Sequence, residues 1–386
     1  MPSGGLDMAL NNYKLGDLLM RNSEENKDLI YGISDVRGVR NAKGISNTKI
    51  DVSGRNLKTF LVVRPGGFIF NHRVHDKLGL GYNTSDETYI FTNDYVSFYV
   101  KPEVKNRILL PDYLYMWYLR PEFDRYMLFK TYGSATLFFS WDNMCELEIE
   151  LPDLPTQQKY VDVYNAMVAN QQAYERSLED LKLTCDAYIE DLRRKMPCEK
   201  IGRYIERHDI RNGKNGSKNV MGISTSKQFR EPTSKVNKNE LANYKVCHPR
   251  QIGFVQTTHN EKVFTYAFNN TKEDIVVSSV NEVFSTQEDK LYPEYLCMFF
   301  NRTEFDRYAR FHSWGSARET FTWNDLIEVK IPIPDIAIQK SIAEMYTVYN
   351  KRKKINEQLK AQIKNICPIL IRGSLEDGGE PNGEPA

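Results

Sequence analysis

The sequence predicts an α+β protein in which two tandem mixed α/β domains are separated by two long helices that form an antiparallel coiled coil. Three observations predict this fold. A segment of the chain recurs after 182 residues, a long helical pattern follows each copy, and a strand-like run ending in proline precedes each helix. A chain of 386 residues is long enough for two or three domains. The duplication predicts a pseudo-twofold internal repeat.

The repeat is strongest between residues 111–157 and 293–339, where 21 of 47 positions are identical without a gap. Unrelated segments of ordinary composition would share roughly 3 positions. A period this long indicates a duplicated domain, not a solenoid. The longest matched runs are Glu-Phe-Asp-Arg-Tyr at 122–126 and 304–308, and Gly-Ser-Ala at 133–135 and 315–317.

Upstream of these segments the two copies differ, so that each has a variable first part, residues 17–110 and 204–292, and a constant second part. Two domains that share one fold and bind two different targets would diverge where they touch those targets. The alternative explanation of this divergence is that the surface residues drifted without selection. The motifs that still correspond are Lys14-Leu15-Gly16 with Lys200-Ile201-Gly202, and Gly32-Ile33-Ser34 with Gly222-Ile223-Ser224.

A long helix is expected after each constant part. Asp153 and Asp335 stand at the expected N-caps, Pro155 is tolerated in a first helical turn, and Pro197 ends the first helix. Apolar and aromatic residues recur at steps of three and four, as in a heptad seam. The seams run Tyr164, Met167, Gln171, Tyr174, Leu178, Leu181, Cys185, Tyr188 and Leu192, and Ile342, Met345, Tyr349, Arg352, Asn356, Leu359, Ile363, Ile366 and Leu370.

Amphipathic helices of this length need a partner for their apolar face. The two seams predict that the helices pack on each other, and the alternative is that each packs on its own domain. The expected division of the chain is a domain over 1–155, a central helix over 156–196, a second domain over 197–337, a C-terminal helix over 338–372 and a disordered tail over 373–386, which is rich in Gly, Pro and Glu.

The composition, with 41% apolar and 27% charged residues, is that of an ordinary soluble protein. No run of about 18 apolar residues is present, so no transmembrane helix is expected. The first residues also lack the pattern of a signal peptide. The six cysteines are scattered without a C-x-x-C pair, which predicts reduced thiols in a cytoplasmic protein.

The net charge of +1 conceals a segregation of charge along the chain. Residues 27–77 hold ten Lys and Arg against four Asp and Glu, and residues 200–262 hold thirteen against five. Residues 142–191, which include the central helix, hold three against twelve. Basic clusters in the variable part of both copies are the pattern expected for contact with nucleic-acid phosphates. The acidic helix is expected to face protein partners, because DNA along it would be repelled.

These clusters supply the candidate DNA-binding residues. Ser134 and Ser316 belong to the matched Gly-Ser-Ala loops, and contact between them and DNA would be with the backbone, because an identical loop cannot distinguish two sequences. A tight turn that requires small residues is the alternative. The full candidate set is Arg37, Arg40, Lys43, His72, Arg73, His75, Lys77, Ser134, Lys214, Lys218, Lys227, Arg230, His259, Lys262, Ser316 and Arg318.

No motif in the sequence predicts catalysis. There is no G-x-x-x-x-G-K-[ST] loop, and no adjacent proline pair of the kind that amino-methyltransferases carry. The pair His72 and His75 lacks the cysteines or carboxylates that would complete a zinc site. The expectation is a recognition module with no catalytic residue, cofactor site or metal site of its own.

Together these features resemble the specificity subunit of type I restriction–modification systems over residues 12–372. The resemblance rests on the order of variable domain, helix, variable domain and helix. It also rests on the block before each helix, which reads Leu151-Pro-Asp-Leu-Pro-Thr-Gln157 and Ile333-Pro-Asp-Ile-Ala-Ile-Gln339. The resemblance implies that each variable domain is a target recognition domain that reads one half of a split site in double-stranded DNA, without catalysis in this chain.

The resemblance also implies partners. Two modification subunits would dock on the helices and methylate adenine N6 with S-adenosylmethionine, and restriction subunits would use ATP with Mg; no membrane is involved. Two rival interpretations stay open. One is a coiled-coil protein-interaction scaffold that does not bind DNA, and the other is the recognition part of a stand-alone methyltransferase or nuclease whose catalytic domain lies on another chain.

Overall fold

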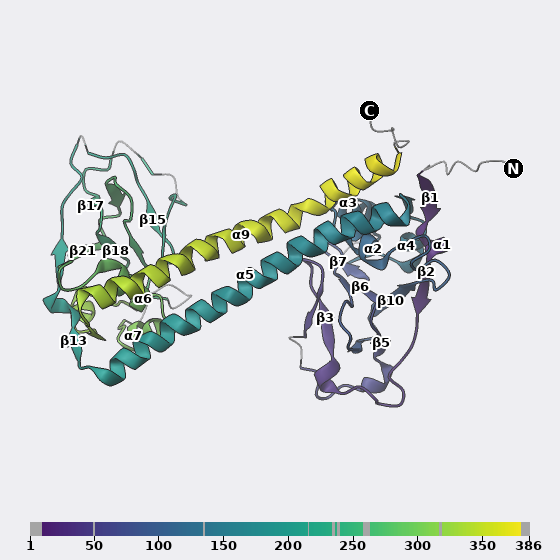
Figure 1. The fold of residues 1–386 in the computed structure, drawn as a ribbon, viewed down its shortest axis with the longest axis horizontal. Helices are drawn as coiled ribbons and strands as arrows, with labels where there is room; N and C mark the ends of the chain where they lie inside the picture. The colour runs from purple at the N-terminus through teal and green to yellow at the C-terminus, as the bar shows by residue number, and fades with distance from the viewer. Residues whose placement is uncertain are drawn as a thin grey trace. The chain divides into compact units, whose positions relative to one another are not determined.

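The computed structural model describes residues 10–48, 51–133, 136–214, 216–233, 236–237, 240–257, 263–315 and 319–379. The chain divides into two compact units. The first unit comprises residues 1–173 and 357–386, and the second unit comprises residues 174–356. Each contains one mixed α/β domain and a stretch of both long helices (Figure 1). The α+β fold with a tandem repeat is therefore confirmed.

The domain of the first unit is built on a four-stranded antiparallel sheet in the order β2-β10-β6-β8. Its elements are β1 (Asn11–Lys14), α1 (Leu15–Leu18), β2 (Leu19–Asn22), η1 (Ile33–Asp35), β3 (Arg37–Val39), β4 (Ile45–Asn47), η2 (Leu57–Thr59), β5 (Leu61–Val63), β6 (Phe68–Asn71), β7 (Arg73–Val74), β8 (Leu80–Tyr82), β9 (Tyr89–Phe91), β10 (Tyr95–Val100), α2 (Pro111–Tyr118), α3 (Pro121–Lys130), β11 (Leu137–Phe138), α4 (Trp141–Cys145) and β12 (Glu148–Leu151).

The domain of the second unit repeats this sheet in the order β14-β21-β18-β19. Its elements are β13 (Cys198–Lys200), η3 (Ile201–Arg203), β14 (Ile205–His208), β15 (Gly222–Ile223), β16 (Phe229–Arg230), β17 (Lys245–Cys247), β18 (Ile252–Phe254), β19 (Tyr266–Phe268), β20 (Ile275–Val277), β21 (Glu282–Thr286), α6 (Pro293–Phe300), α7 (Thr303–Phe311), α8 (Trp323–Ile327) and β22 (Lys330–Pro332). The long helices are α5 (Leu154–Lys195) and α9 (Ile336–Gly379).

The start of each domain is tied to its end in the same way. Leu15 N–H donates to Leu147 O at 2.8 Å, and Ile201 N–H donates to Val329 O at 2.9 Å. The next residue is a glycine in both copies, and a Cβ at Gly202 would stand 2.7 Å from the Ile327 Cβ. Such a distance is far below van der Waals contact, so the close approach of these segments requires glycine. The correspondence of the two Lys-x-Gly motifs is confirmed.

The correspondence between Gly32-Ile33-Ser34 and Gly222-Ile223-Ser224 is wrong. Gly32 precedes the 3-10 turn η1, whereas Gly222 begins strand β15. The true counterpart of β15 is β3, because each opens a hairpin whose turn is closed by the same pair of bonds. Lys43 N–H donates to Arg40 O at 2.9 Å, and Lys227 N–H donates to Ser224 O at 2.9 Å. The correct offset in this region is therefore 184 residues.

The start of each long helix is fixed by a buried glutamine. Gln157 Nε2 donates to Ile108 O at 2.8 Å and to Pro152 O at 2.9 Å, while its Oε1 accepts from Leu110 N–H at 3.0 Å. Gln339 makes the same three bonds at 2.8, 2.7 and 2.8 Å. A buried amide that bonds three backbone groups locks the helix to its domain.

The expected helix starts are also confirmed. The Asp153 carboxylate accepts from Thr156 N–H at 3.0 Å, as an N-cap does, and Pro155 lies in the first turn of α5. In α9 the N-cap position is Asp335, whose backbone oxygen accepts from Gln339 N–H at 3.1 Å. The helix α5 ends at Lys195, two residues before Pro197.

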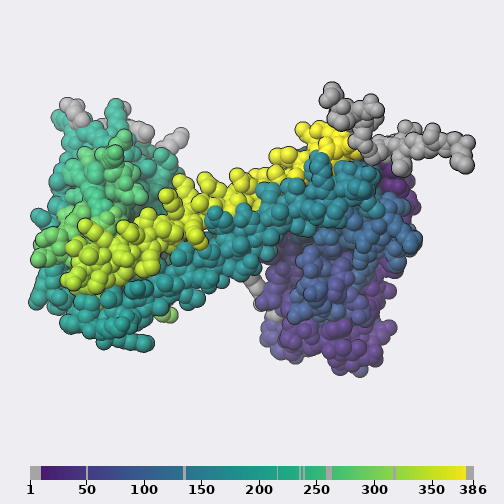
Figure 2. Space-filling model, in the orientation of Figure 1, coloured from purple at the N-terminus to yellow at the C-terminus, as the bar shows by residue number. Residues whose placement is uncertain are grey.

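The two helices run antiparallel beside each other within each unit (Figure 1). In the first unit Lys159 of α5 pairs with Asp377 of α9 at 2.6 Å, and in the second unit Ser177 bonds Arg352. In Figure 2 the last turns of α9, in yellow, lie against the start of α5. Each helix also packs on its own domain, since Val161 of α5 belongs to the core of the first domain and Ile342 of α9 belongs to the core of the second. Both expected modes of packing therefore occur together.

The disordered tail expected from Gly373 is wrong for residues 373–379, because α9 continues to Gly379. These residues are held by the first domain. The buried Ser374 hydroxyl is 2.7 Å from the Tyr113 hydroxyl, and Asp377 accepts a hydrogen bond from Tyr160 Oη at 2.9 Å. A Cβ at Gly373 would stand 3.0 Å from Tyr160 Oη, so the small residue lets the helix approach. Residues 380–386 lie outside the described part of the chain.

No helix among the described residues is long and apolar enough to cross a membrane. All six cysteines lie in the described part of the chain and none forms a disulfide.

Candidate DNA interface

Three loops of the first domain meet at one edge of its main sheet. The tip of the β3–β4 hairpin joins β8, since Gly44 N–H donates to Leu80 O at 2.7 Å. The segment between β6 and β8 contains β7, which pairs with β11 from the hairpin that follows α3. Phe139 N–H also donates to His72 O at 2.9 Å. The sheet thus presents three loops, far apart in the sequence, on one surface.

This edge gathers most of the basic candidates of the first domain. Arg40 is exposed on the hairpin tip, and Arg73, His75 and Lys77 are exposed on the loop between β6 and β8. The His72 ring stacks on Phe138, with ring centroids 5.5 Å apart. The sequence could not show that Arg40 and the loop at 72–79 are neighbours, because the sheet register brings them together.

A groove of about 800 Å³ runs from this hairpin to the first part of α5. Arg37 lines it, and its guanidinium lies 4.4 Å from the centroid of the Tyr89 ring, a cation–π contact. Its other walls carry Tyr115, whose pKa burial raises to about 12, and Asp112, whose carboxyl pKa is raised by burial. The groove is therefore polar, with cationic groups on the hairpin side.

Lys43 is not exposed at this edge, because its side chain points into the domain and is 4% exposed. Its Nζ donates to Tyr118 O at 2.5 Å and to Asp124 Oδ1 at 2.8 Å. Burial lowers the pKa of this ammonium, while the bond to Asp124 and the charge of Asp124 act in the opposite direction. The backbone of Lys43 is left-handed, with φ of 63°, which turns the side chain inward.

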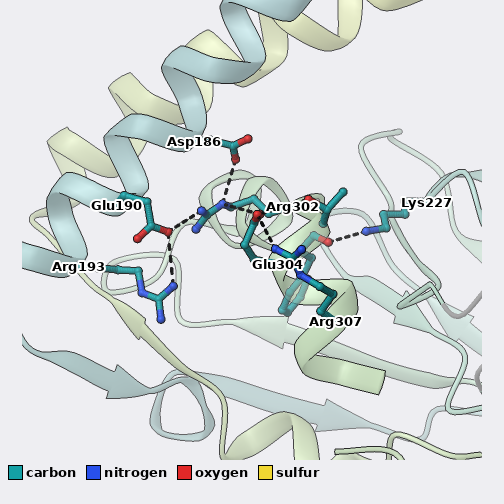
Figure 3. Close-up of polar contacts among 9 residues, drawn as sticks. Asp186, Glu190, Arg193, Lys227, Arg302, Glu304 and Arg307 are labelled. Atoms are coloured by element: carbon teal, nitrogen blue, oxygen red, sulfur yellow. Dashed lines mark hydrogen bonds and ion pairs between the residues drawn. The ribbon is translucent and has the colours of Figure 1, made fainter. Parts of the chain in front are cut away.

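Lys227 repeats this arrangement in the second domain (Figure 3). Its Nζ donates to Phe300 O and to Asp306 Oδ1, both at 2.8 Å, its side chain is 7% exposed and its φ is 62°. We call these two pairs, Lys43–Asp124 and Lys227–Asp306, the lysine clamps. Each fixes a variable hairpin to a constant helix, so we remove both lysines from the DNA-contacting set.

The same three loops meet in the second domain. Phe321 N–H donates to Gln256 O at 2.8 Å, and Thr257 bridges Thr320. Phe264 N–H donates to Asp306 Oδ1 at 3.0 Å, which joins the loop to α7. The candidates His259, Lys262, Ser316, Arg318 and, in the first domain, Ser134 lie outside the described residues.

Of the other basic candidates of the second domain, Lys214 and Lys218 lie away from this edge and Arg230 lies near it. Lys214 and Lys218 are exposed on a segment that is joined to β20 through the bond from Val276 N–H to Asn219 O, at 2.9 Å. Arg230 is exposed on β16, beside the hairpin tip. The structure therefore groups the candidates of the first domain more closely than those of the second.

A buried ionic cluster near this edge of the second domain escaped the sequence analysis. The Glu282 carboxylate accepts from the Arg207 guanidinium at 2.6 and 2.8 Å and from Gln256 Nε2 at 2.7 Å. Lys245 Nζ lies 3.3 Å from the same carboxylate. In the first domain Leu61 and Val96 hold the positions of Lys245 and Glu282 in the equivalent strands. The two domains thus share a framework and differ in polarity beside the edge.

Residues 199–365 match the family model of the type I restriction modification DNA specificity domain. This segment is similar to that specificity domain. No curated protein sequence matches the chain. The match begins in β13, the strand that opens the second domain, and extends into α9.

One solved structure shows the same fold over nearly the whole chain, and two others align with lower scores. The crystal structure of the type I restriction-modification S subunit from M. genitalium aligns over 99% of both chains, with 9% identity and a TM-score of 0.56. A chain from work on complex assembly and conformational transition of the type I R-M system is 12% identical over 97% of this chain and 100% of its own, with a TM-score of 0.47. The HsdS subunit from Thermoanaerobacter tengcongensis is 12% identical over 97% of each chain, with a TM-score of 0.37.

Some acidic residues of helix α5 are paired within the chain itself. Arg302, whose side chain is 6% exposed, donates to Asp186 at 2.9 Å and to Glu190 at 2.6 Å (Figure 3). The bond to Arg302 lowers the pKa of Glu190. Arg120, at the same position of the first domain, instead covers the Trp117 ring at 4.4 Å. Part of the negative charge assigned to partner docking therefore serves to anchor the helix.

Among the described residues, no group of three or more His, Cys, Asp or Glu side chains is placed to hold a metal ion.

Proposed function

We propose that this chain is the DNA sequence-specificity subunit of a type I restriction–modification complex. It reads a bipartite target in double-stranded DNA, one half-site with each domain, and docks modification and restriction subunits. The observation that supports the proposal most directly is the duplicated edge at which three loops meet, two of them from the variable part of each domain and one from the constant part. The similarity of residues 199–365 to the specificity domain and the basic residues at the edge of the first domain add to it.

In the first domain, exposed cations at the edge bind phosphates and set the position of the domain on the duplex. These cations are Arg40, Arg73 and Lys77. Phosphate contacts carry no sequence information, so the sequence is read by polar side chains that reach the base edges. In the second domain the ionic cluster around Glu282 holds Gln256 rigid beside the interface. Because the two edges differ in these residues, the two half-sites differ in sequence.

The chain itself supplies recognition and no chemistry. Two modification subunits, adenine N6 methyltransferases, bring S-adenosylmethionine, and restriction subunits bring ATP and Mg. The basis is the absence of any catalytic motif in the sequence, together with the similarity of residues 199–365 to the specificity domain.

The test is a comparison of methylated bases across the host genome with this gene present and deleted. Loss of one bipartite N6-methyladenine motif on deletion is the expected result, and restoring the gene should restore the motif. A methylome that is unchanged, with the partner genes shown to be expressed, would contradict the proposal. That result would favour the coiled-coil scaffold that does not bind DNA.

A further inference from the structure

Each domain exposes two large aromatic side chains at matching positions of its constant part. Phe129 is 83% exposed and Tyr132 is 59% exposed, while Phe311 is 81% and Trp314 is 73% exposed. Both pairs are separated by the 182-residue period of the repeat. We call them the aromatic patches. Aromatic rings are normally buried, so full exposure at the same two positions of both copies indicates a function outside the fold.

The framework of the domain does not use these rings. In α3 the residues that face the core are Phe123 and Met127, and in α7 they are Phe305 and Ala309. The patches lie instead on the last turn of each helix and the hairpin that follows. Replacing them is therefore expected to leave the fold unchanged.

The hairpins hold the second ring of each patch in a fixed place. Tyr132 and Phe138 exchange two backbone hydrogen bonds of 3.1 and 2.8 Å, and Trp314 and Thr320 exchange two of 3.2 and 2.9 Å. The next residue is a left-handed glycine in both copies, with φ of 116° at Gly133. A Cβ there would stand 2.1 Å from Thr136 O, so the turn is tight. Rings that are fixed before binding lose little entropy on burial, as is typical of interface anchors.

The duplication of the rings favours a protein over DNA as the occupant. Phe, Tyr and Trp are enriched at the centres of protein interfaces. Lys130, next to Phe129, is already paired with Glu146 at 3.3 Å. The charged residues that follow the hairpin differ between the copies, since Asn324 and Lys330 stand where the first copy has Asp142 and Glu148. The ring pair itself is present twice, so it fits two copies of one partner and cannot distinguish two different half-sites.

We propose that the two aromatic patches are equivalent docking sites for two copies of one protein. The inference rests on the proposed function, under which this partner is the modification subunit. The Tyr132 ring lies 6.0 Å from the Phe138 ring, which in turn stacks on His72 at the candidate DNA interface. A modification subunit on the patch of the first domain would stand beside the DNA that this domain holds. The two patches would be docking sites on the domains, in addition to the docking expected on the long helices.

The test measures how many modification subunits bind to one molecule of each full-length variant. The variants are F129S with Y132S, F311S with W314S, and all four changes together. The matched controls are Ile30→Ser and Val280→Ser, which remove exposed apolar residues of 75% and 71% exposure that are not duplicated. Each variant is co-expressed with the modification subunit of the same host, and the mass of the purified complex is measured by native mass spectrometry. The thermal unfolding of each variant is compared with that of the wild type.

We expect the wild type and both controls to carry two modification subunits, each two-residue variant to carry one, and the four-residue variant to carry none. Loss of two anchor rings should weaken each site at least about 30-fold, with unfolding temperatures unchanged. A four-residue variant that keeps two subunits would overturn the inference. If such a complex instead lost affinity for DNA, the rings would contact DNA. A wild type that binds no modification subunit would refute the proposed function itself.

Discussion

Removal of residues 357–386 should unfold the first domain and leave the second domain folded, although the deleted segment follows the second domain in the sequence. The reason is that the end of α9 belongs to the first unit. Cys367, Leu370 and Ile371 are buried in the same core as the sheet of the first domain. At about 2 kcal/mol for each buried side chain, their loss removes about 6 kcal/mol. That is comparable with the whole free energy of unfolding of a domain.

Hydrogen exchange resolved by mass spectrometry measures this directly. Amides of β6 and β10 should lose protection in the truncated chain, and amides of β18 and β21 should keep it. A chain lacking only residues 380–386 is the control and should behave as the wild type. Leu370→Ala with Ile371→Ala gives a milder full-length variant, expected to destabilise the first domain by about 4–8 kcal/mol. Loss of protection confined to the second domain would contradict the division into units.

Replacing the lysine of one clamp by methionine is expected to destabilise only the domain that contains it. Lys43→Met keeps the length of the side chain and removes the charge, which leaves the Asp124 carboxylate without its cation and Tyr118 O without its donor. Breaking a buried ion pair from one side costs about 3–5 kcal/mol. Lys227→Met should destabilise the second domain in the same way. The loss of stability should be smaller there, because Asp306 keeps the hydrogen bond from Phe264 N–H.

Urea unfolding followed by hydrogen exchange measures the stability of each of the two domains in this experiment. The control for charge alone is Lys77→Met, an exposed lysine of the same edge, which should change the free energy of unfolding by less than about 0.5 kcal/mol. Combining Lys43→Met with Asp124→Leu should recover most of the loss, since both charges are then gone. Stability unchanged by Lys43→Met would show that the pair does not hold the hairpin.

Much of the fold follows from local signals in the sequence. The identical segments 111–157 and 293–339 predict the duplication, and the proline-aspartate blocks predict where α5 and α9 begin. These signals are strong because caps and turns depend on residues only a few positions apart. The glutamines at 157 and 339 also recur at the same place in both copies, and the structure places both at the junction between domain and helix.

The lysine clamps show what the sequence cannot provide. Lys43 reads as one more basic residue in a basic stretch, because its partner Asp124 lies 81 positions away. In the second copy the separation is 79 positions, so the register between the copies also shifts. Only the folded sheet places each lysine over its aspartate. The match between Gly32 and Gly222 is false for a related reason. The Gly-Ile-Ser triplet recurs by chance, at an offset that differs from the offset of the equivalent strands β3 and β15.

The C-terminal segment shows a second limit. The glycines at 373, 378 and 379 and the acidic residues between them suggest a disordered tail. The helix nevertheless continues, because contacts with Tyr113, Lys159 and Tyr160 offset the weak helical propensity of glycine. All of these partners lie in the other half of the sequence. Tertiary packing from a distant segment thus overrides the local preference.

The most direct test of the proposal that each domain reads its own half-site is to exchange the variable part of one domain. Residues 19–110 are replaced by the corresponding residues of another member of the family, which leaves β1, α1 and the bond from Leu15 N–H to Leu147 O intact. Sequencing of methylated bases in cells that carry the hybrid is the measurement. We predict that one half-site changes while the other half-site and the spacer stay the same. A change in both half-sites, or in neither, would contradict the division of recognition between the two domains.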